Sequence, residues 1–440
     1  MLVENTELIA SNISRDTDGE LMFAGRRVSE LAEKYFTPLY LYDEERIREK
    51  CRIYKGAIQR CFGENAKVLY ASKAASFMRM YKIMEEEEMG IDVVSAGEIH
   101  TALTAGYPVS KIYFHSNSKT ESDIEYAIAY DIGYIVVDHE DELAVIDRFC
   151  RCRGWKQKVL LRITPGIDPH TYEEVATGKV DSKFGSAIET GQAKAITELA
   201  LKYPYVDLCG FHCHVGSQVF DSSVYIGAAK VMLDFVKDIY DELGYMAKEL
   251  DIGGGFGVRY IAEQPEIDIA KSIEEVALFM KGYADKLGID LPTIIMEPGR
   301  SIVADAGMTV YTVGTVKRIP EYKNYVSVDG GMTDNPRYAL YRAPYTVLPV
   351  SGPVGEDAMT VSVVGRCCES GDIIQENVSM PESIARGDLV AVLTTGAYNY
   401  SMASNYNRIP RPPVVMISKD GDYLAVRRET FADMAAFDVL

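Results

Sequence analysis

The chain has 440 residues, of which 47% are hydrophobic and 25% charged, so it is long enough for two globular domains. Its formal net charge of −19 repels phosphate backbones, which argues against nucleic acid as a partner. No basic segment typical of a signal peptide opens the chain, and no apolar run approaches the roughly 18 residues that span a bilayer. The 8 cysteines show no CxxC spacing, so we expect reduced thiols in a cytoplasmic protein without a membrane partner.

Short apolar runs alternate with helical segments from residue 68 onward. The runs cover residues 68–72, 91–95, 112–116, 134–138, 158–163, 208–215, 249–254 and 293–298. Near-continuous apolar strands separated by helices predict a parallel sheet that is covered on both faces. Eight such units predict an α/β fold with a closed (β/α)₈ barrel, for which we expect residues 35–300.

Two other segments depart from this alternation. The connection at 164–186 is long and rich in turn residues, so it is either a functional lid or a surface insertion. After residue 300 the pattern becomes β-rich without long helices, and KDGD at 419–422 supplies a turn between two strands. We therefore expect a second, antiparallel β domain built from residues 1–34 and 301–440.

The first barrel strand ends in Ser72 and Lys73. The carboxyl ends of barrel strands are the positions at which such folds place their chemistry. Partial burial would lower the pKa of the Lys73 amine and leave more free base to attack a carbonyl. Pyridoxal phosphate (PLP) is a carbonyl cofactor that needs such a lysine. An ordinary strand-end lysine whose amine reaches back to water also fits these residues.

Polar groups and glycines also follow the other predicted strands. They are Ser95, His115, Asn117, His214, Gly253, Gly254, Gly255 and Glu297. The glycine-rich turn would let backbone N–H groups approach a phosphate, or it is simply a tight turn. Val258 replaces the third glycine of the dinucleotide fingerprint. His214 could stack on a cofactor ring, and we expect no metal, because His212 and His214 lack a third ligand with suitable spacing.

The eighth strand ends in EPGR, residues 297–300. A buried Glu297 carboxylate beside a pyridine nitrogen would hold that nitrogen protonated, which makes the ring a strong electron sink. The planar fork of Arg300 suits a carboxylate or a phosphate. A surface salt bridge is the ordinary alternative for these four residues.

Reactive groups in the expected β domain lie in CCESGD, residues 367–372. A neutral Cys368 thiol is a candidate proton donor, and Glu369 is a candidate receptor for a substrate amine. A buried structural cysteine is the more common role for such a thiol. Tyr398, in a polar, tyrosine-rich loop, could reach a phosphate.

Assembled in order, these motifs resemble the barrel-fold PLP-dependent decarboxylases of basic amino acids, and among them most of all the diaminopimelate decarboxylases. The resemblance runs from about residue 25 to 425. Its motifs are YASKA, DVVSAGE, FHSNSKT, SKFG, HCHVGSQ, DIGGGFG, EPGR, VDGGMTDNPRYALY, CESGD and GAYNYSMASNYNRIPRP. It implies an alanine racemase-like architecture, PLP as cofactor, and conversion of meso-2,6-diaminopimelate to L-lysine and CO₂.

The resemblance also implies roles for individual residues. Lys73 would carry the cofactor, with Asp92 near it, His214 on its ring and Glu297 at its ring nitrogen. The groups implied around the phosphate or the substrate carboxylate are Ser217, Gly253, Gly254, Gly255, Arg300 and Tyr398. Those implied at the distal end of the substrate are Arg337, Tyr341 and Glu369, with Cys368 as proton donor. The last two residues of that set, Glu369 and Cys368, would come from the partner subunit of a homodimer.

Some residues depart from the family pattern. Ala75 stands where asparagine is usual, Arg366 lies where a proline is often near, and Tyr345 stands where histidine is common. The alternatives are a decarboxylase of ornithine, lysine or arginine, which has no use for Arg337, and a PLP racemase, which generally avoids a carboxylate at the ring nitrogen. A non-catalytic homologue would be expected to lack Lys73 or Cys368.

Overall fold

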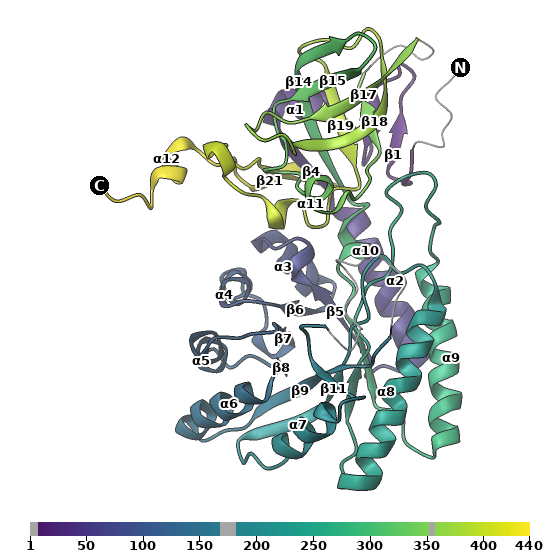
Figure 1. The fold of residues 1–440 in the computed structure, drawn as a ribbon, viewed down its shortest axis with the longest axis vertical. Coiled ribbons are helices and arrows are strands. Elements are labelled where there is room, and N and C mark those ends of the chain that lie inside the picture. The colour runs from purple at the N-terminus through teal and green to yellow at the C-terminus, as the bar shows by residue number, and fades with distance from the viewer. Residues whose placement is uncertain (1–7, 168–181, 352–356) are drawn as a thin grey trace. The chain divides into compact units, whose positions relative to one another are not determined.

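The structure is a computed structural model that describes residues 8–167, 182–351 and 357–440. It consists of two compact units (Figure 1). The barrel unit comprises Lys50–Gly257 and Ile267–Ser301, and the β unit comprises Met1–Glu49, Val258–Glu266 and Ile302–Leu440. Most of the long connection expected to be a lid or insertion, residues 168–181, lies outside the described residues.

The eight apolar runs form the expected closed barrel. The strands are β5 (Lys67–Ala71), β6 (Gly90–Val93), β7 (Ile112–Phe114), β8 (Tyr134–Val137), β9 (Gln157–Thr164), β11 (Val206–His212), β12 (Glu249–Asp251) and β13 (Thr293–Met296). All neighbouring pairs are parallel, and β13 pairs with β5 to close the ring. A short extra strand, β10 (Ser186–Ala187), pairs with β9. The closed ring confirms the fold expected from the sequence.

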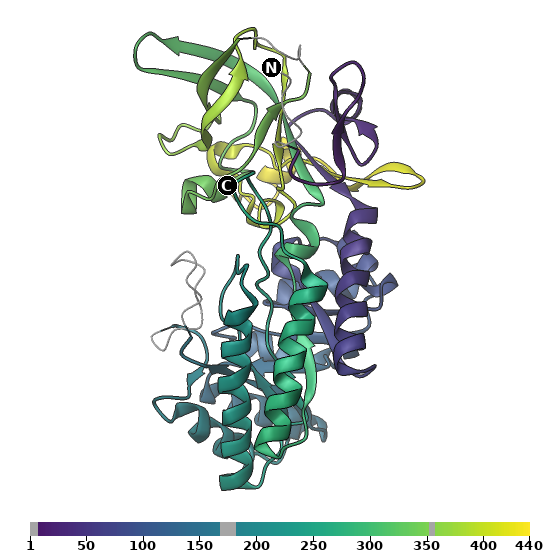
Figure 2. The same ribbon diagram turned by 90° about the vertical axis from the view of Figure 1, so that its right-hand side faces the viewer.

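Helices cover the outside of this barrel (Figure 1). They are α2 (Glu44–Phe62), α3 (Met78–Glu86), α4 (Ala96–Thr104), α5 (Glu121–Ala129), α6 (Glu140–Arg153), α7 (Gln192–Ala200), α8 (Ser222–Leu243) and α9 (Ile269–Leu287). A short helix, α10 (Arg300–Val303), follows β13. Figures 1 and 2 show α8 and α9 side by side. Both begin after an aspartate whose carboxylate accepts a backbone N–H, and both end at a left-handed glycine, which are common helix boundaries.

The amino ends of the barrel strands are closed by a polar and aromatic plug. Lys67 Nζ lies 2.5 Å from Glu249 Oε1, and the rings of Tyr113 and Tyr134 stack with centroids 4.1 Å apart. Lys67 also lies over the ring of Tyr134, at 5.0 Å from its centroid. Because these side chains pair with one another, we interpret the plug as structural. The active site of such a barrel is expected at the opposite face, at the carboxyl ends of the strands.

The β unit contains a mixed sheet and a three-stranded sheet. The strands of the large sheet are β4 (Leu39–Asp43), β14 (Gly307–Ile319), β15 (Lys323–Val328), β16 (Val347–Pro349), β17 (Ala358–Val364), β18 (Ile373–Pro381), β19 (Leu389–Leu393), β20 (Val414–Ser418) and β21 (Gly421–Val426). Most pairs are antiparallel, as expected, but β15–β17 and β20–β4 are parallel. The KDGD turn joins β20 to β21 in a hairpin, which confirms that prediction.

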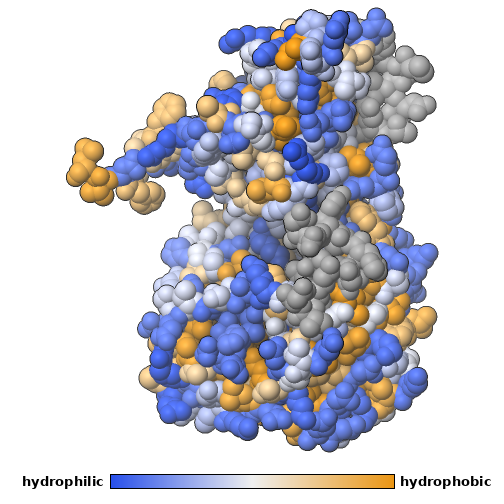
Figure 3. Space-filling model, in the orientation of Figure 1, coloured by the Kyte–Doolittle hydropathy of each residue, from blue (hydrophilic) through white to orange (hydrophobic). Residues whose placement is uncertain are grey.

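Smaller elements complete the β unit. They are β1 (Ile13–Arg15), β2 (Leu21–Phe23), β3 (Arg26–Arg27), α1 (Val28–Tyr35), α11 (Arg337–Tyr341) and α12 (Phe431–Ala435). Strand β4 precedes the barrel in sequence but belongs to this unit, since it lies between β14 and β20. No helix in the described ranges is long and apolar enough to cross a membrane. Hydrophobic and hydrophilic residues are interspersed over the face in Figure 3.

A buried carboxyl, that of Asp334, holds the turn before α11. Its side chain accepts hydrogen bonds from the hydroxyls of Tyr311 and Thr333 and from the backbone N–H of Gly331, while its carbonyl accepts one from Tyr40. Burial raises the pKa of Asp334 to about 7, although these hydrogen bonds oppose the rise. The folded protein therefore favours the protonated carboxyl.

Replacing Asp334 with asparagine should change how stability depends on pH. Between about pH 4 and pH 7 the unfolded chain loses the Asp334 proton and the folded chain keeps it. The free energy of unfolding of the wild type should therefore fall by on the order of 4 kcal/mol relative to that of Asp334→Asn as the pH rises through this interval. Denaturant titrations of both proteins at pH 4 and pH 7.5 measure this difference. A difference that stays constant with pH would show that Asp334 titrates like an exposed carboxyl.

Candidate active site

Four buried side chains meet at the carboxyl ends of β6, β7, β11 and β13. His115 Nε2 lies 2.7 Å from Glu297 Oε1, and His212 Nε2 donates to Glu297 Oε2 at 3.1 Å. Asp92 Oδ1 lies 3.8 Å from His115 Nε2. The four residues expose between 1% (His212) and 7% (Glu297) of their surface. The barrel thus gathers a carboxylate and two imidazoles away from water.

The electrostatics of this cluster leave Glu297 as an anion. Burial alone would raise its pKa, but His115 and His212 outweigh burial and hold the pKa of Glu297 well below its usual value. Burial lowers the pKa of His212 to about 4, so at neutral pH this ring is uncharged and acts through its N–H donor. A buried anion at a barrel mouth is a suitable partner for a protonated heterocycle.

Two neighbouring carboxyls behave in the opposite way. Burial, and then the charge of Glu297, raise the pKa of Asp251 well above its usual value, while the backbone N–H of Gly253 donates to its Oδ1 at 2.8 Å. Burial also raises the pKa of Asp92, against the opposing effect of His115. Asp251 ends β12 just before the glycine-rich turn, and no pattern in the sequence marked it as a site residue.

His115, His212 and Glu297 also have the composition of a metal-binding triad. Their ligand atoms lie within 4.8 Å of one another, and all three are buried. The sequence suggested His212 and His214 as the candidate metal pair instead, because alternation along one strand places both on the same face. The signal that could have found the triad was the position of His115 and Glu297 at the ends of two other barrel strands.

Lys73 lies in a single helical turn, Ser72–Ala74, directly after β5. Both of its neighbours in this turn are buried, whereas the Lys73 residue is exposed. The turn carries the side chain beyond the apolar strand. The charge of Lys73 nevertheless acts on Asp92 and on His214, whose pKa is lowered well below its usual value by burial first and then by Lys73.

The glycine-rich turn approaches its neighbours too closely for any side chain. A Cβ at Gly253 would lie 2.6 Å from the Cys213 carbonyl oxygen, and one at Gly254 would lie 2.0 Å from that of Glu297. Gly255, with φ of 107°, would meet the carbonyl oxygen of Gly216 at 2.0 Å. Within the described residues, the N–H groups of Gly254 and Gly255 donate no hydrogen bond. These donors are available to an anion.

Arg300 is buried beside the loop that follows β11. Its Nε and Nη2 each donate to Ser217 Oγ at 3.0 Å. The structure therefore brings together two residues that the sequence assigned to a phosphate or a carboxylate. Asp92 lies within β6, and the other predicted groups of the barrel unit, from Lys73 to Arg300, lie on residues that follow the carboxyl ends of its strands.

The other predicted residues belong to the β unit. Arg337 begins α11 and is 5% exposed, and Tyr341 ends the same helix. Cys368 and Glu369 are exposed on the loop between β17 and β18, where the backbone N–H of Cys368 donates to Asn407 Oδ1 at 2.8 Å. Tyr398, in a turn after β19, has a left-handed φ of 67°. The expectation of a buried structural cysteine therefore does not apply to Cys368.

Two further groups, one half-buried and one buried, support these residues. Glu98 on α4 accepts hydrogen bonds from Ser72 Oγ at 2.7 Å and from the backbone N–H of Val94 at 2.8 Å, which fixes the turn that carries Lys73. Tyr260, in the β unit, lies against Arg337 with its ring centroid 4.8 Å from the guanidinium carbon. Glu98 ends the DVVSAGE motif, and Tyr260 lies three residues after DIGGGFG.

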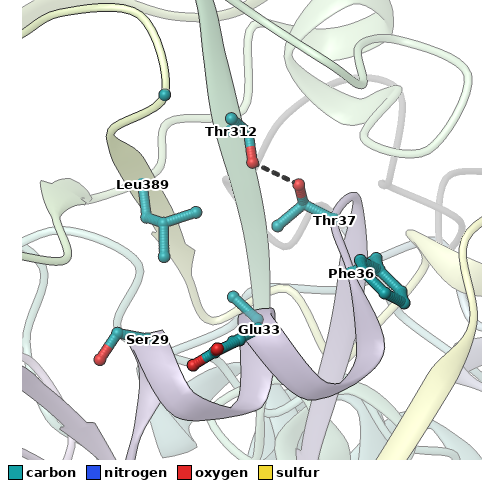
Figure 4. Close-up of a pocket in the computed structure, with 8 residues that line it drawn as sticks. Ser29, Glu33, Phe36, Thr37, Thr312 and Leu389 are labelled. Carbon is teal, nitrogen blue, oxygen red and sulfur yellow. Dashed lines mark hydrogen bonds between the residues drawn. The ribbon is translucent and has the colours of Figure 1, made fainter.

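A separate hollow of about 350 Å³ lies in the β unit (Figure 4). Its lining residues include Ser29, Glu33, Thr37, Thr312 and Leu389. Thr37 and Thr312 bind each other through their hydroxyls. With one carboxylate and mainly hydroxyl or apolar groups, this hollow offers no set of catalytic side chains.

Comparisons with known proteins identify relatives of this chain. The profile of the family described as "Pyridoxal-dependent decarboxylase, pyridoxal binding domain" matches residues 44–304. The chain is 44% identical to the diaminopimelate decarboxylase of Bacillus subtilis over 422 residues, which cover 96% of this chain and 95% of that protein. It is 44% identical to that of Bacillus methanolicus, over 93% of this chain and 95% of the relative.

Solved structures show the same relationship. The diaminopimelate decarboxylase of M. jannaschii, in complex with L-lysine, has a TM-score of 0.90 and 34% identity, over 98% of each chain. That of Helicobacter pylori, also with L-lysine, has a TM-score of 0.84 and 32% identity, over 93% of this chain and 98% of the other. The chain therefore belongs to the PLP-dependent decarboxylases, in the diaminopimelate decarboxylase family.

Proposed function

We propose that this protein uses PLP to decarboxylate meso-2,6-diaminopimelate to L-lysine and CO₂, the last step of lysine biosynthesis. The observation that carries the choice of substrate is Arg337. This cation is 5% exposed, and within the described residues it forms no ion pair with an aspartate or glutamate. A buried guanidinium without an anion is costly, and a second carboxylate on the substrate supplies that anion.

The barrel residues fit the cofactor. The anionic Glu297 suits a protonated ring nitrogen, and the uncharged His214 ring offers a flat face. The unused N–H groups of Gly254 and Gly255, in a turn with no room for a Cβ, suit a phosphate. Lys73 supplies the amine. These residues would hold PLP, with Ser217 and Arg300 at the phosphate or the substrate carboxylate.

Each residue then has a defined task in the proposed reaction. When bound, the pyridine ring of PLP accepts the electron pair left by the departing carboxylate. Glu297 holds a proton at the ring nitrogen, and Lys73 holds and recovers the cofactor. Cys368 delivers one proton to the carbon that lost CO₂, which balances the bond that breaks. Arg337 and Tyr341 hold the distal carboxylate, and Glu369 holds the distal amine.

We further propose a homodimer in which each barrel site takes Cys368 and Glu369 from the partner. The exposure of both residues on one loop supports this, because a proton donor has to be shielded from water when it acts. The 8 cysteines are all free thiols, which supports a cytoplasmic location.

Purified protein with PLP should convert meso-diaminopimelate to equal amounts of L-lysine and CO₂. Borohydride reduction and peptide mapping should place the pyridoxyl group on Lys73. The Lys73→Ala variant should have a kcat at least about 1000-fold lower than the wild type. Lys281→Ala, an exposed lysine on α9, is the matched control and should keep full activity. Label on another lysine would refute the role of Lys73, and preference for lysine or ornithine would refute the substrate.

Mixing Lys73→Ala and Cys368→Ala proteins should restore activity if sites are shared between subunits. A mixed dimer has one doubly altered site and one intact site, so random exchange restores about a quarter of wild-type activity. Differently tagged subunits report the exchange itself. Exchange without recovery would mean that each site is built from a single chain.

A further inference from the structure

Arg337 lies beside two tyrosine rings that contact each other. Its guanidinium carbon is 4.8 Å from the ring centroid of Tyr260 and 5.4 Å from that of Tyr345. The two rings are nearly perpendicular, at 88°, with centroids 5.4 Å apart. Arg337 Nη1 donates to the hydroxyl oxygen of Tyr345 at 2.7 Å. The aromatic faces and this hydrogen bond fix the plane of the guanidinium, which would otherwise rotate on a flexible stem.

Both rings are themselves held in place. The backbone N–H of Tyr345 donates to Gln375 Oε1 at 2.9 Å. The carbonyl of Tyr260 accepts from the backbone N–H and the hydroxyl of Thr346, at 3.1 and 2.9 Å. Tyr260 and Tyr345 are 2% and 3% exposed. The pair is therefore a rigid support for the arginine.

The hydrogen bonds of Tyr345 leave its own proton for another acceptor. Asn399 Nδ2 donates to the Tyr345 oxygen at 3.2 Å and to the Thr395 carbonyl at 3.1 Å. A carbonyl only accepts, so it fixes the orientation of the Asn399 amide. Arg337 also only donates. The Tyr345 oxygen thus accepts two hydrogen bonds, and within the described residues its O–H has no acceptor.

We propose that Tyr345 is a specificity-determining residue that, supported by Tyr260 and Asn399, orients the Arg337 fork and donates its own O–H to the same substrate carboxylate. This inference rests on the proposed function and adds a residue to it. An arginine and a phenol together offer three donors to a carboxylate, whereas an uncharged or purely cationic end of a substrate would find no partner there.

The product supplies a direct probe of this contact. When one end of diaminopimelate loses CO₂, the lysine that remains keeps the carboxylate of the other end. Cadaverine has the same carbon chain and two amines but no carboxylate. L-Lysine and cadaverine therefore differ by the one group that Tyr345 and Arg337 are proposed to bind.

The test uses the PLP-loaded enzyme and its Tyr345→Phe variant, which keeps the ring and removes the hydroxyl. The KM for meso-diaminopimelate and the inhibition constant of L-lysine should each rise about 10-fold, with kcat within about 2-fold and the inhibition constant of cadaverine unchanged. Tyr35→Phe is the matched control, since it removes a hydroxyl that binds Asp422 elsewhere in the β unit. It should change neither the KM for meso-diaminopimelate nor the inhibition constant of L-lysine. Cofactor absorbance and thermal unfolding report folding.

A second variant, Asn399→Ala, keeps the test decisive if Tyr345→Phe does not fold. Removing the amide that holds Tyr345 should raise the inhibition constant of L-lysine about 3-fold and leave the inhibition constant of cadaverine unchanged. Equal weakening of both inhibitors, or no change in either, would overturn the role of Tyr345. Failure of the proposed function has a different signature, because wild-type enzyme would then not turn over diaminopimelate, or would bind cadaverine as tightly as L-lysine.

Discussion

The barrel site depends on keeping one carboxylate ionised where water does not reach. Burying an anion is expensive, and Glu297 offsets that cost through two imidazoles, His115 and His212, contributed by two other strands. Its charge in turn contributes to the raised pKa of Asp251 and Asp92, so within the cluster it opposes the ionisation of the other two carboxyls. The position of that charge decides where a cationic nitrogen can bind.

The β unit buries a cation, the guanidinium of Arg337. Arg337 is buried without an acidic partner in the described chain, and aromatic faces and a phenol oxygen surround it instead. Such a setting tolerates the guanidinium but does not neutralise it, because phenols are uncharged at neutral pH. An anionic group on the substrate would therefore gain more from Arg337 than from an arginine already paired with a carboxylate.

Much of this arrangement could be predicted from the sequence, and the reason is periodicity. Eight apolar runs, each followed by polar residues or glycines, place Lys73, Glu297 and the glycine turn at one edge of a barrel without reference to any contact. The pairing of Glu297 with His115 could not be predicted in this way, since the two are 182 residues apart and meet only when the barrel closes. The short helical turn that carries Lys73 after the strand was not predicted either, because three residues are too few to show a helical period.

Tyr260 and Asp334 illustrate a further limit. Neither lies at a strand end, and each has a partner remote in sequence, Arg337 for Tyr260 and Tyr311 for Asp334, so no local pattern marks it. The family resemblance supplied Arg337 but not the tyrosines that hold it. Contacts of this kind require the folded chain, whereas the order of the motifs requires only the sequence.

The most direct test of the account is the protonation of the ring nitrogen that Glu297 is proposed to hold. Enzyme reconstituted with PLP labelled with ¹⁵N in the ring reports it through the nitrogen chemical shift in an NMR spectrum at neutral pH. The account predicts a protonated nitrogen in the wild type and an unprotonated one in Glu297→Gln, which cannot carry the negative charge. An unprotonated nitrogen in the wild type, or the same shift in both proteins, would contradict it.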